Sequence, residues 1–325
     1  MERRAFLAAV SMTLLAAPDP AGGQRPGRVY RVGIIHQGGL NAVVVDGLRA
    51  GLSDLGLDEG TQIVLDIRDT HGSLAAVEEA ARDLERGSVD LIYTAATSVT
   101  IAAKRATAKT PIVFYAGNDP IAAGLVQSLA KPGGRLTGVH GLSGELTAKR
   151  LQVLKEMLPG LARVVSFYSP GNAVARNAAR LGRESARQLG VEFVDRHVGS
   201  AEELRRVLQT LQLQDGEAVF YLSDAMVTSQ AELIIEAARA KKWPTMFHET
   251  SLVVKGALAS YGPSFREIGR MSAKHVQRVL TGTHPKDLPV ENYHKVEFAL
   301  NLRTAREIGL AIPPAVLARV DKIIE

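Results

Sequence analysis

Polar side chains follow the apolar runs of this sequence at the points where those runs end. They are His36, Gln37, Thr97, Ser98, Asn118, Asp119, Ser169, Asn172, Ser223, Asp224, His248 and Glu249. Hydroxyl, amide and carboxylate groups at such points can hold a small polar molecule through hydrogen bonds and ion pairs. In open α/β sheets, ligands lie beyond the carboxyl ends of the strands, so these residues are candidates for a binding site.

Patterns that indicate catalysis or metal binding are absent from the sequence. The eight His residues include no pair at i, i+4, and the absence of cysteine excludes disulfides and thiol chemistry. The segment 141–144, Gly-Leu-Ser-Gly, lacks the spacing of a Gly-x-Ser-x-Gly nucleophile elbow. No Gly-rich phosphate loop follows the first predicted strand, and no acid–base pair stands out. We therefore expect no cofactor, no metal and no enzymatic activity.

Two of the candidate pairs follow the third and fourth predicted strands of the first half of the chain. Thr97 and Ser98 begin a predicted helix, whose free N–H groups suit a carboxylate, while the alternative is an ordinary N-cap. Asn118 and Asp119 precede Pro120, and the alternative for them is a turn without a ligand.

Asp224 is the candidate partner for a ligand ammonium group, because exclusion of water would strengthen the ion pair. Ser223 would contact the same ligand. Helix capping is the alternative role for Asp224. However, Ser229-x-x-Glu232 has the pattern of a separate capping box, which predicts that Asp224 is not needed as a cap.

The remaining candidates have similar alternatives. Four of them, in equivalent turns of the two halves, would contact the ligand or lie in solvent-exposed loops: His36, Gln37, Ser169 and Asn172. His248 and Glu249 follow the last predicted strand of the second half. Tyr261 would stack on a flat part of the ligand, or it would pack within a hinge.

The elements that position these residues are strands alternating with helices. Val29–Ile35 and Val89–Tyr93 are typical of buried strands, and helical periodicity follows each of them. The order repeats after Arg163–Tyr168, and Ala201–Leu211 has the periodicity of a helix in this second half. Matching strands of the two halves lie about 130 residues apart. This alternation predicts parallel sheets that are covered by helices on both faces.

Two such sheets in one chain predict two lobes with a cleft between them. We expect an α/β fold of two Rossmann-like, doubly wound parallel-sheet lobes. Lobe 1 is predicted to comprise residues 28–139 and 262–291, and lobe 2 residues 140–261 and 292–325. Three extended runs at the joints predict a three-strand hinge of parallel strands, which would let the lobes close around a ligand.

The amino terminus has the pattern of a secretory signal. Glu2-Arg3-Arg4 precedes the apolar segment 5–17, and a Pro- and Gly-rich segment follows. We interpret residues 1–23 as a signal peptide, with Arg3-Arg4 resembling a twin-arginine motif, and we expect the mature protein in the periplasm. Without cysteine it is not a lipoprotein. A formal charge of +5 with no dense Lys/Arg run argues against nucleic-acid binding, and we expect a monomer.

Three stretches resemble a known family. They are residues 117–138, from Gly117-Asn118-Asp119-Pro120 to Gly133-Gly134; residues 260–263, Ser-Tyr-Gly-Pro; and residues 287–314, with Asp287-Leu288-Pro289 and Asn301-Leu302-Arg303. Together they resemble the ABC-transporter substrate-binding family, whose characterised members take up tryptophan and related amino acids. The resemblance covers nearly the whole chain after residue 30. The sequence differs from its relatives after the first and third predicted strands, at His36-Gln37-Gly38-Gly39 and Ala96-Thr97-Ser98.

The resemblance implies a type I periplasmic-binding fold, and a solute receptor that delivers an amino acid or related carboxylate to an ABC permease in the inner membrane. Two alternatives stay open at this point. The same receptor could instead serve a signalling partner, or the two lobes could carry a hydrolase or another enzyme.

Overall fold

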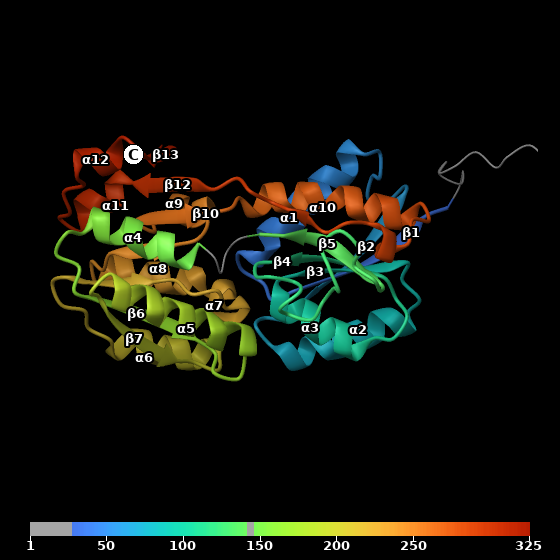
Figure 1. Cartoon of the computed structure of the whole chain (residues 1–325), viewed down its shortest axis with the longest axis horizontal. Coiled ribbons are helices and arrows are strands. Elements are labelled where there is room, and N and C mark those ends of the chain that lie inside the picture. The colour runs from blue at the N-terminus through green and yellow to red at the C-terminus, as the bar shows by residue number, and fades with distance from the viewer. Residues whose placement is uncertain (1–27, 142–145) are drawn as a thin grey trace, which may run out of the picture.

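Strands and helices alternate along the chain and build two sheets that lie side by side in a computed structural model (Figure 1). The structure describes residues 28–141 and 146–325. The predicted signal peptide, residues 1–23, lies outside the described residues.

The sheet of lobe 1 has six strands in the order β11-β5-β4-β3-β1-β2, all parallel. The strands are β1 (Tyr30–His36), β2 (Ile63–Asp69), β3 (Leu91–Ala95), β4 (Ile112–Ala116), β5 (Leu136–His140) and β11 (Glu291–Asn292). Helices cover both of its faces in Figure 1, namely α1 (Asn41–Asp54) with α10 (Phe265–Leu280), and α2 (Leu74–Arg86) with α3 (Thr97–Ala106).

The sheet of lobe 2 has seven strands in the order β13-β12-β10-β9-β8-β6-β7. They are β6 (Arg163–Tyr168), β7 (Glu192–His197), β8 (Glu217–Phe220), β9 (Thr245–Phe247), β10 (Ala259–Gly262), β12 (Glu297–Asn301) and β13 (Lys322–Ile324). Its helices are α4 (Thr147–Met157), α5 (Ala173–Gln188), α6 (Ala201–Thr210), α7 (Ala225–Ser229), α8 (Ala231–Ala240), α9 (Thr250–Val254), α11 (Leu302–Glu307) and α12 (Pro314–Leu317). A short 3-10 helix, η1 (Pro285–Asp287), precedes β11.

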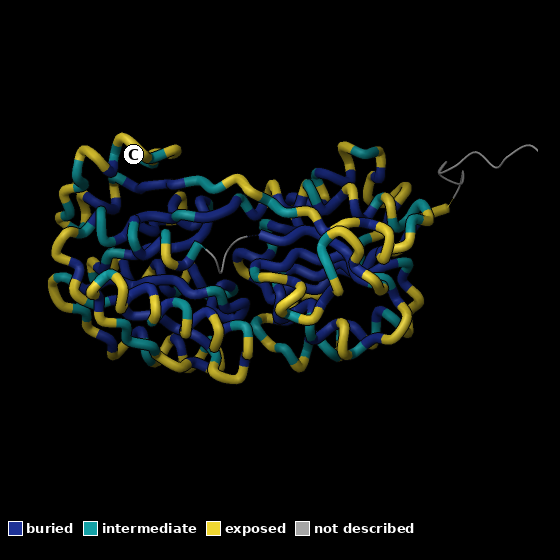
Figure 2. The backbone as a smooth tube through the Cα atoms, in the orientation of Figure 1, coloured by how far each residue is buried: buried dark blue, intermediate teal, exposed yellow. Residues whose placement is uncertain are grey.

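The central strands of each sheet form the buried core of its lobe. Every residue of β3, β4 and β5 is buried, because helices pack on both faces of a parallel sheet. Figure 2 shows this buried backbone running through the middle of each lobe beneath an exposed outer layer. The prediction of an α/β fold with two parallel-sheet lobes is confirmed.

Helices α1 and α10 approach each other closely, and glycine makes this possible. A Cβ atom on Gly47 would lie 2.0 Å from the carbonyl oxygen of Arg266, and one on Gly269 would lie 2.0 Å from the carbonyl oxygen of Val44. Real Cβ atoms do not approach backbone this closely, so both positions require glycine. Residues more than 200 positions apart in sequence therefore share one helical layer of lobe 1.

The chain passes between the two sheets three times, after β5, after β10 and between β11 and β12. The second passage runs back toward lobe 1, and β10 pairs with β12 in the antiparallel sense. The prediction that the strands at the hinge are all parallel is therefore wrong, because successive passages must alternate in direction. The exact boundaries predicted for the lobes stay a prediction.

Candidate functional site

Residues that follow strands of both sheets face each other across a cleft between the lobes. Three cavities lie along it. The smallest, which we name the central pocket, has a volume of about 30 Å³. It is lined by Ala96, Thr97, Ser98, Tyr115, Gly117 and Asn118 from lobe 1 and by Val174, Tyr221, Ser223, Asp224, Ala225 and Thr228 from lobe 2.

A hydrogen bond links the lobes at the central pocket. The Asn118 side-chain amide donates from Nδ2 to the hydroxyl of Ser223 at 3.3 Å. On the lobe 1 side, the backbone N–H of Asn118 donates to Thr97 Oγ1, also at 3.3 Å. The structure thus brings together three of the residues predicted from sequence.

The amino terminus of α3 opens onto the central pocket. Its N-cap is Ala96, which has φ 112° and forms no side-chain cap. The alternative that Thr97 or Ser98 is an ordinary N-cap is therefore wrong, because both lie inside the helix. Their hydroxyls and the uncapped end of α3 remain directed to the cleft, where a helix terminus favours a negative group.

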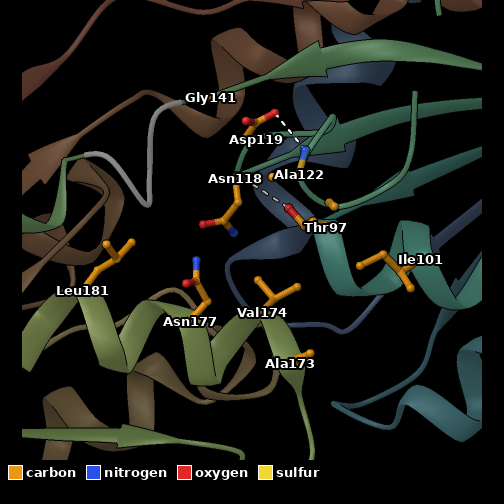
Figure 3. Close-up of a pocket in the computed structure, with 12 residues that line it drawn as sticks. Thr97, Ile101, Asn118, Asp119, Ala122, Gly141, Ala173, Val174, Asn177 and Leu181 are labelled. Atoms are coloured by element: carbon orange, nitrogen blue, oxygen red, sulfur yellow. Dashed lines mark hydrogen bonds between the residues drawn. The ribbon is translucent and has the colours of Figure 1, made fainter. Parts of the chain in front are cut away.

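A larger cavity of about 490 Å³, which we name the apolar pocket, lies between α3 and α5. Its lining comprises Thr97, Ile101, Gly117, Asn118, Asp119, Ala122, Ala123 and Gly141 from lobe 1 and Ala173, Val174, Asn177 and Leu181 from lobe 2. Asn118 and Asn177 point toward each other across it (Figure 3). Asp119 is exposed, and its Oδ1 accepts the N–H groups of Ile121 and Ala122, so this carboxylate forms the turn that was its alternative role.

A third cavity, of about 480 Å³, includes Ser169, whose N–H donates to Asp224, and we name it the polar pocket. It is lined by Gln37, His71, Gly72, Ser73 and Leu74 from lobe 1 and by Ser169, Gly171, Asn172, Gly199, Ser200, Ala201 and Met226 from lobe 2. Gln37 is only 1% exposed, and within the described part of the chain neither its amide oxygen nor its nitrogen has a hydrogen-bond partner. Asn172 caps α5 by accepting the N–H of Val174 at 3.1 Å. Gln37, Ser169 and Asn172 thus meet at one cavity.

His36 lies at the end of β1 and is buried beside this region. Its Nδ1 accepts the backbone N–H of Gly38 at 3.0 Å. Burial lowers the pKa of His36, so the ring is neutral near pH 7. It supports the turn after β1 and is not among the residues that line the three pockets.

Asp224 serves as the N-cap of α7. Its Oδ1 accepts the N–H of Val227 at 3.0 Å, and its Oδ2 accepts the N–H of Ser169 at 2.9 Å. Burial raises the pKa of Asp224 above its ordinary value. The predicted capping box at Ser229 and Glu232 is wrong, because Ser229 ends α7 and α8 begins after Gln230 without a side-chain cap.

The last three predicted residues do not line the three pockets. Glu249 is the N-cap of α9 and accepts the N–H of Ser251 at 2.7 Å, while burial raises its pKa. Tyr261 packs on Phe298 with ring centroids 6.2 Å apart, which matches its hinge-packing alternative. His248 stacks on Tyr221, which lines the central pocket, with ring centroids 3.7 Å apart.

Arg150 is the residue near the cleft that the sequence analysis missed. It lies on α4, is fully buried, and donates from Nε to the carbonyl oxygen of Tyr261 at 3.0 Å. Its guanidinium carbon lies 5.8 Å from the ring centroid of Tyr221. The sequence did carry a signal for this burial. Leu154 and Met157 follow Arg150 by four and seven positions, a helical spacing that places the three side chains on one buried face.

Two features are absent from the described parts of the chain, 28–141 and 146–325. No group of three or more His, Asp or Glu side chains there is arranged to hold a metal ion. None of the helices in these ranges has the length and apolar content to cross a bilayer.

Comparison with known proteins agrees with this geometry. The sequence model of a family described as ABC transporter substrate binding protein matches residues 32–324. A tyrosine-binding protein of Clostridioides difficile is 26% identical over 265 residues, which are 81% of this chain and 76% of that protein.

Solved structures are similar as well. A conserved domain protein from Vibrio cholerae has a TM-score of 0.81 at 29% identity, covering 91% of this chain and all of that one. A protein from Streptococcus pneumoniae, described as an ABC domain in complex with L-Trp, has a TM-score of 0.79 at 23% identity with the same coverage. At that identity the second likeness shows the fold alone.

Proposed function

The chain belongs to the family of ABC transporter substrate binding proteins, and from this premise we propose that it binds one amino acid or a related small carboxylate between its lobes. We further propose that it works in the periplasm after export and delivers the solute to an ABC permease in the inner membrane. The amino-terminal pattern of residues 1–23 supports the export step.

One observation carries the proposal, namely that the two lobes share their pockets. Asn118 of lobe 1 and Ser223 of lobe 2 are joined by a hydrogen bond at the central pocket. A solute held there touches both lobes only when they are together, so its binding energy shifts the protein toward the closed form. A receptor that presents its closed form to a permease needs this coupling.

The size of the pockets indicates how the solute lies. The central pocket, at about 30 Å³, has room for about one water molecule, so the lobes must separate to admit a solute. The apolar pocket, at about 490 Å³, falls within the range of small-molecule sites. We place the polar end of the solute at the central pocket and an apolar or aromatic side chain between α3 and α5.

The relatives support this chemistry. One is described as tyrosine-binding and another was solved in complex with L-Trp. Ile101, Val174 and Leu181 supply apolar surface for a side chain of that kind, and Asn177 adds a polar group at its edge.

A thermal-shift screen tests the proposal. The purified mature protein is heated with each of the amino acids, with aromatic amino-acid derivatives and with small carboxylates. Because a solute that binds only the folded state stabilises it, a saturating ligand at about 100 times its Kd contributes about 2.7 kcal/mol and raises Tm by several degrees. Recovery of the bound solute unchanged would exclude turnover. A panel without any stabilising compound would refute the proposal.

A further inference from the structure

Arg150 is a buried cation. Its side chain is 0% exposed, and among the residues that the structure describes neither Nη1 nor Nη2 has a hydrogen-bond partner. Within the described residues, 28–141 and 146–325, no carboxylate forms an ion pair with it, and it contacts the carbonyl oxygen of Tyr261 and the ring of Tyr221. Burial lowers the pKa of Arg150 to about 10, so it stays charged at neutral pH. Buried charges are normally paired, because desolvation without compensation is unfavourable.

The position of Arg150 relates it to the cleft. Its guanidinium lies against the ring of Tyr221, and Tyr221 itself lines the central pocket together with Tyr115. The hydroxyl of Tyr221 is bonded to Thr228 Oγ1 at 2.8 Å, which fixes the ring. Only the side chain of Tyr221 therefore separates Arg150 from the central pocket.

Rings from both lobes contact one another next to Tyr221. His248 of lobe 2 contacts Phe265, the first residue of α10 in lobe 1, with ring centroids 5.1 Å apart. Phe265 also contacts Tyr115 at 5.3 Å. Separation of the lobes would move Phe265 and Tyr115 away from His248 and Tyr221, so the ring cluster that Arg150 contacts would become accessible from the cleft.

We propose that Arg150 binds the carboxylate of the solute when the lobes close around it. This assignment rests on the function proposed above and specifies the residue that recognises the carboxylate. The two η-amino groups can donate a pair of parallel hydrogen bonds to a carboxylate, a bidentate geometry that arginine offers and lysine does not. The uncapped end of α3 faces the same pocket from lobe 1. A carboxylate held by both would connect the lobes, whereas an uncharged solute would leave the buried cation unpaired.

The test compares two ligands in two proteins. L-Tryptophan and L-tyrosine, or the amino acid that stabilises the wild type most in the screen, are titrated by calorimetry alongside their carboxamides. The amide keeps the shape of the ligand and removes the negative charge. The variants are Arg150→Met, which removes the cation, and Arg150→Lys, which keeps a charge without the fork. Arg206→Met, on the exposed face of α6, is the matched control.

We expect the wild type and Arg206→Met to bind the acid at least about tenfold more tightly than the amide. In Arg150→Met this preference should fall to about twofold or less, and Arg150→Lys should lie between. A purely structural role for Arg150, through its bond to the Tyr261 carbonyl, would weaken both ligands equally and keep the ratio.

Three results overturn the assignment. The first is a wild type that binds acid and amide equally, which needs no variant and so does not depend on the folding of Arg150→Met. The second is an unchanged acid-to-amide ratio in Arg150→Met or, if that variant does not fold, in Arg150→Lys. In both of these cases the receptor function stands. The third is the failure of every amino acid and carboxylate to bind the wild type, which refutes the proposed function together with the assignment.

Discussion

Replacing Gly39 with alanine should hold the lobes apart. Gly39 precedes α1 in lobe 1, and a Cβ atom there would lie 2.3 Å from the carbonyl oxygen of Ser229, which ends α7 in lobe 2. Ordinary contact begins at 3.4 Å, so the two lobes would have to separate locally by 3.4 − 2.3 = 1.1 Å. The atom that blocks closure is backbone and cannot rotate away.

The magnitude follows from the two effects of the methyl group. Gly39 has φ +55°, and a side chain in this left-handed region costs about 1–2 kcal/mol in any state of the lobes. The overlap with Ser229 adds about 1–3 kcal/mol, as overpacking does in cores, but only when the lobes are together. A solute that binds the closed form should therefore lose affinity by about 5- to 150-fold.

Gly124→Ala separates the two effects. Gly124 has a similar φ of +66°, but no atom lies within 4 Å of its would-be Cβ. Both variants should lose similar stability toward urea, while only Gly39→Ala should bind solute weakly in calorimetry and keep a larger radius of gyration with solute in small-angle X-ray scattering. Equal affinities for the two variants would refute the reasoning that Gly39 meets lobe 2 in the closed form.

Other predictions concern individual polar groups. Asn118→Ala removes the inter-lobe hydrogen bond and should weaken solute binding by about 0.5–1.5 kcal/mol in calorimetry; unchanged affinity would contradict a role in closure. Asp224→Ala should lower the free energy of unfolding in urea by about 2–4 kcal/mol, because a helix cap is lost and a buried N–H is left unpaired. Asp224→Asn should lower it by an intermediate amount. Ser200→Ala, which removes an exposed cap, should lower it much less. Since burial raises the pKa of Asp224, the folded state binds this proton more tightly, and the contribution of Asp224 to stability should fall as pH rises above about 3.8; Asp224→Asn should remove that slope. Glu85 should behave oppositely. Burial opposes the charge of Glu85, but hydrogen bonds from the N–H groups of residues 108–110 outweigh burial and lower the pKa of Glu85 to about 2. The contribution of Glu85 to folding stability should therefore be lost as pH falls from 4.5 toward 2. Glu85→Gln should flatten this loss in acid titrations of stability.

The sheets were predictable because buried parallel strands appear in sequence as continuous apolar runs. Arg163–Tyr168 was predicted as a strand and is β6, and the helix predicted at Ala201–Leu211 is α6, one residue shorter. The direction of β12 against β10 was not predictable in this way, since apolar content is the same for either direction. The fold class follows from local patterns, whereas strand direction follows from the path of the whole chain.

The sequence predicted where the candidate site lies more successfully than it predicted the role of each residue there. Thr97, Asn118 and Ser223 meet at one pocket because strands end at the same edge of each sheet. The role of Asp224 was misjudged because Ser229 lies at the end of a five-residue helix that local pattern does not reveal. Arg150 was not predicted because its neighbours Tyr221 and Tyr261 come from the turn after β8 and from β10, which sequence spacing does not place beside α4.

The shared layer of α1 and α10 has a consequence for synthesis on the ribosome. Residues 30–140 emerge first, but the face of their sheet that α10 covers stays unprotected until residues 265–280 have been made, and β11 follows later still. Lobe 2 emerges in between and lacks its own last strands until residue 324. Lobe 1 therefore cannot complete its core until β11 has been made. Its nascent sheet should expose apolar surface through most of the synthesis of lobe 2, which must emerge before the last parts of lobe 1.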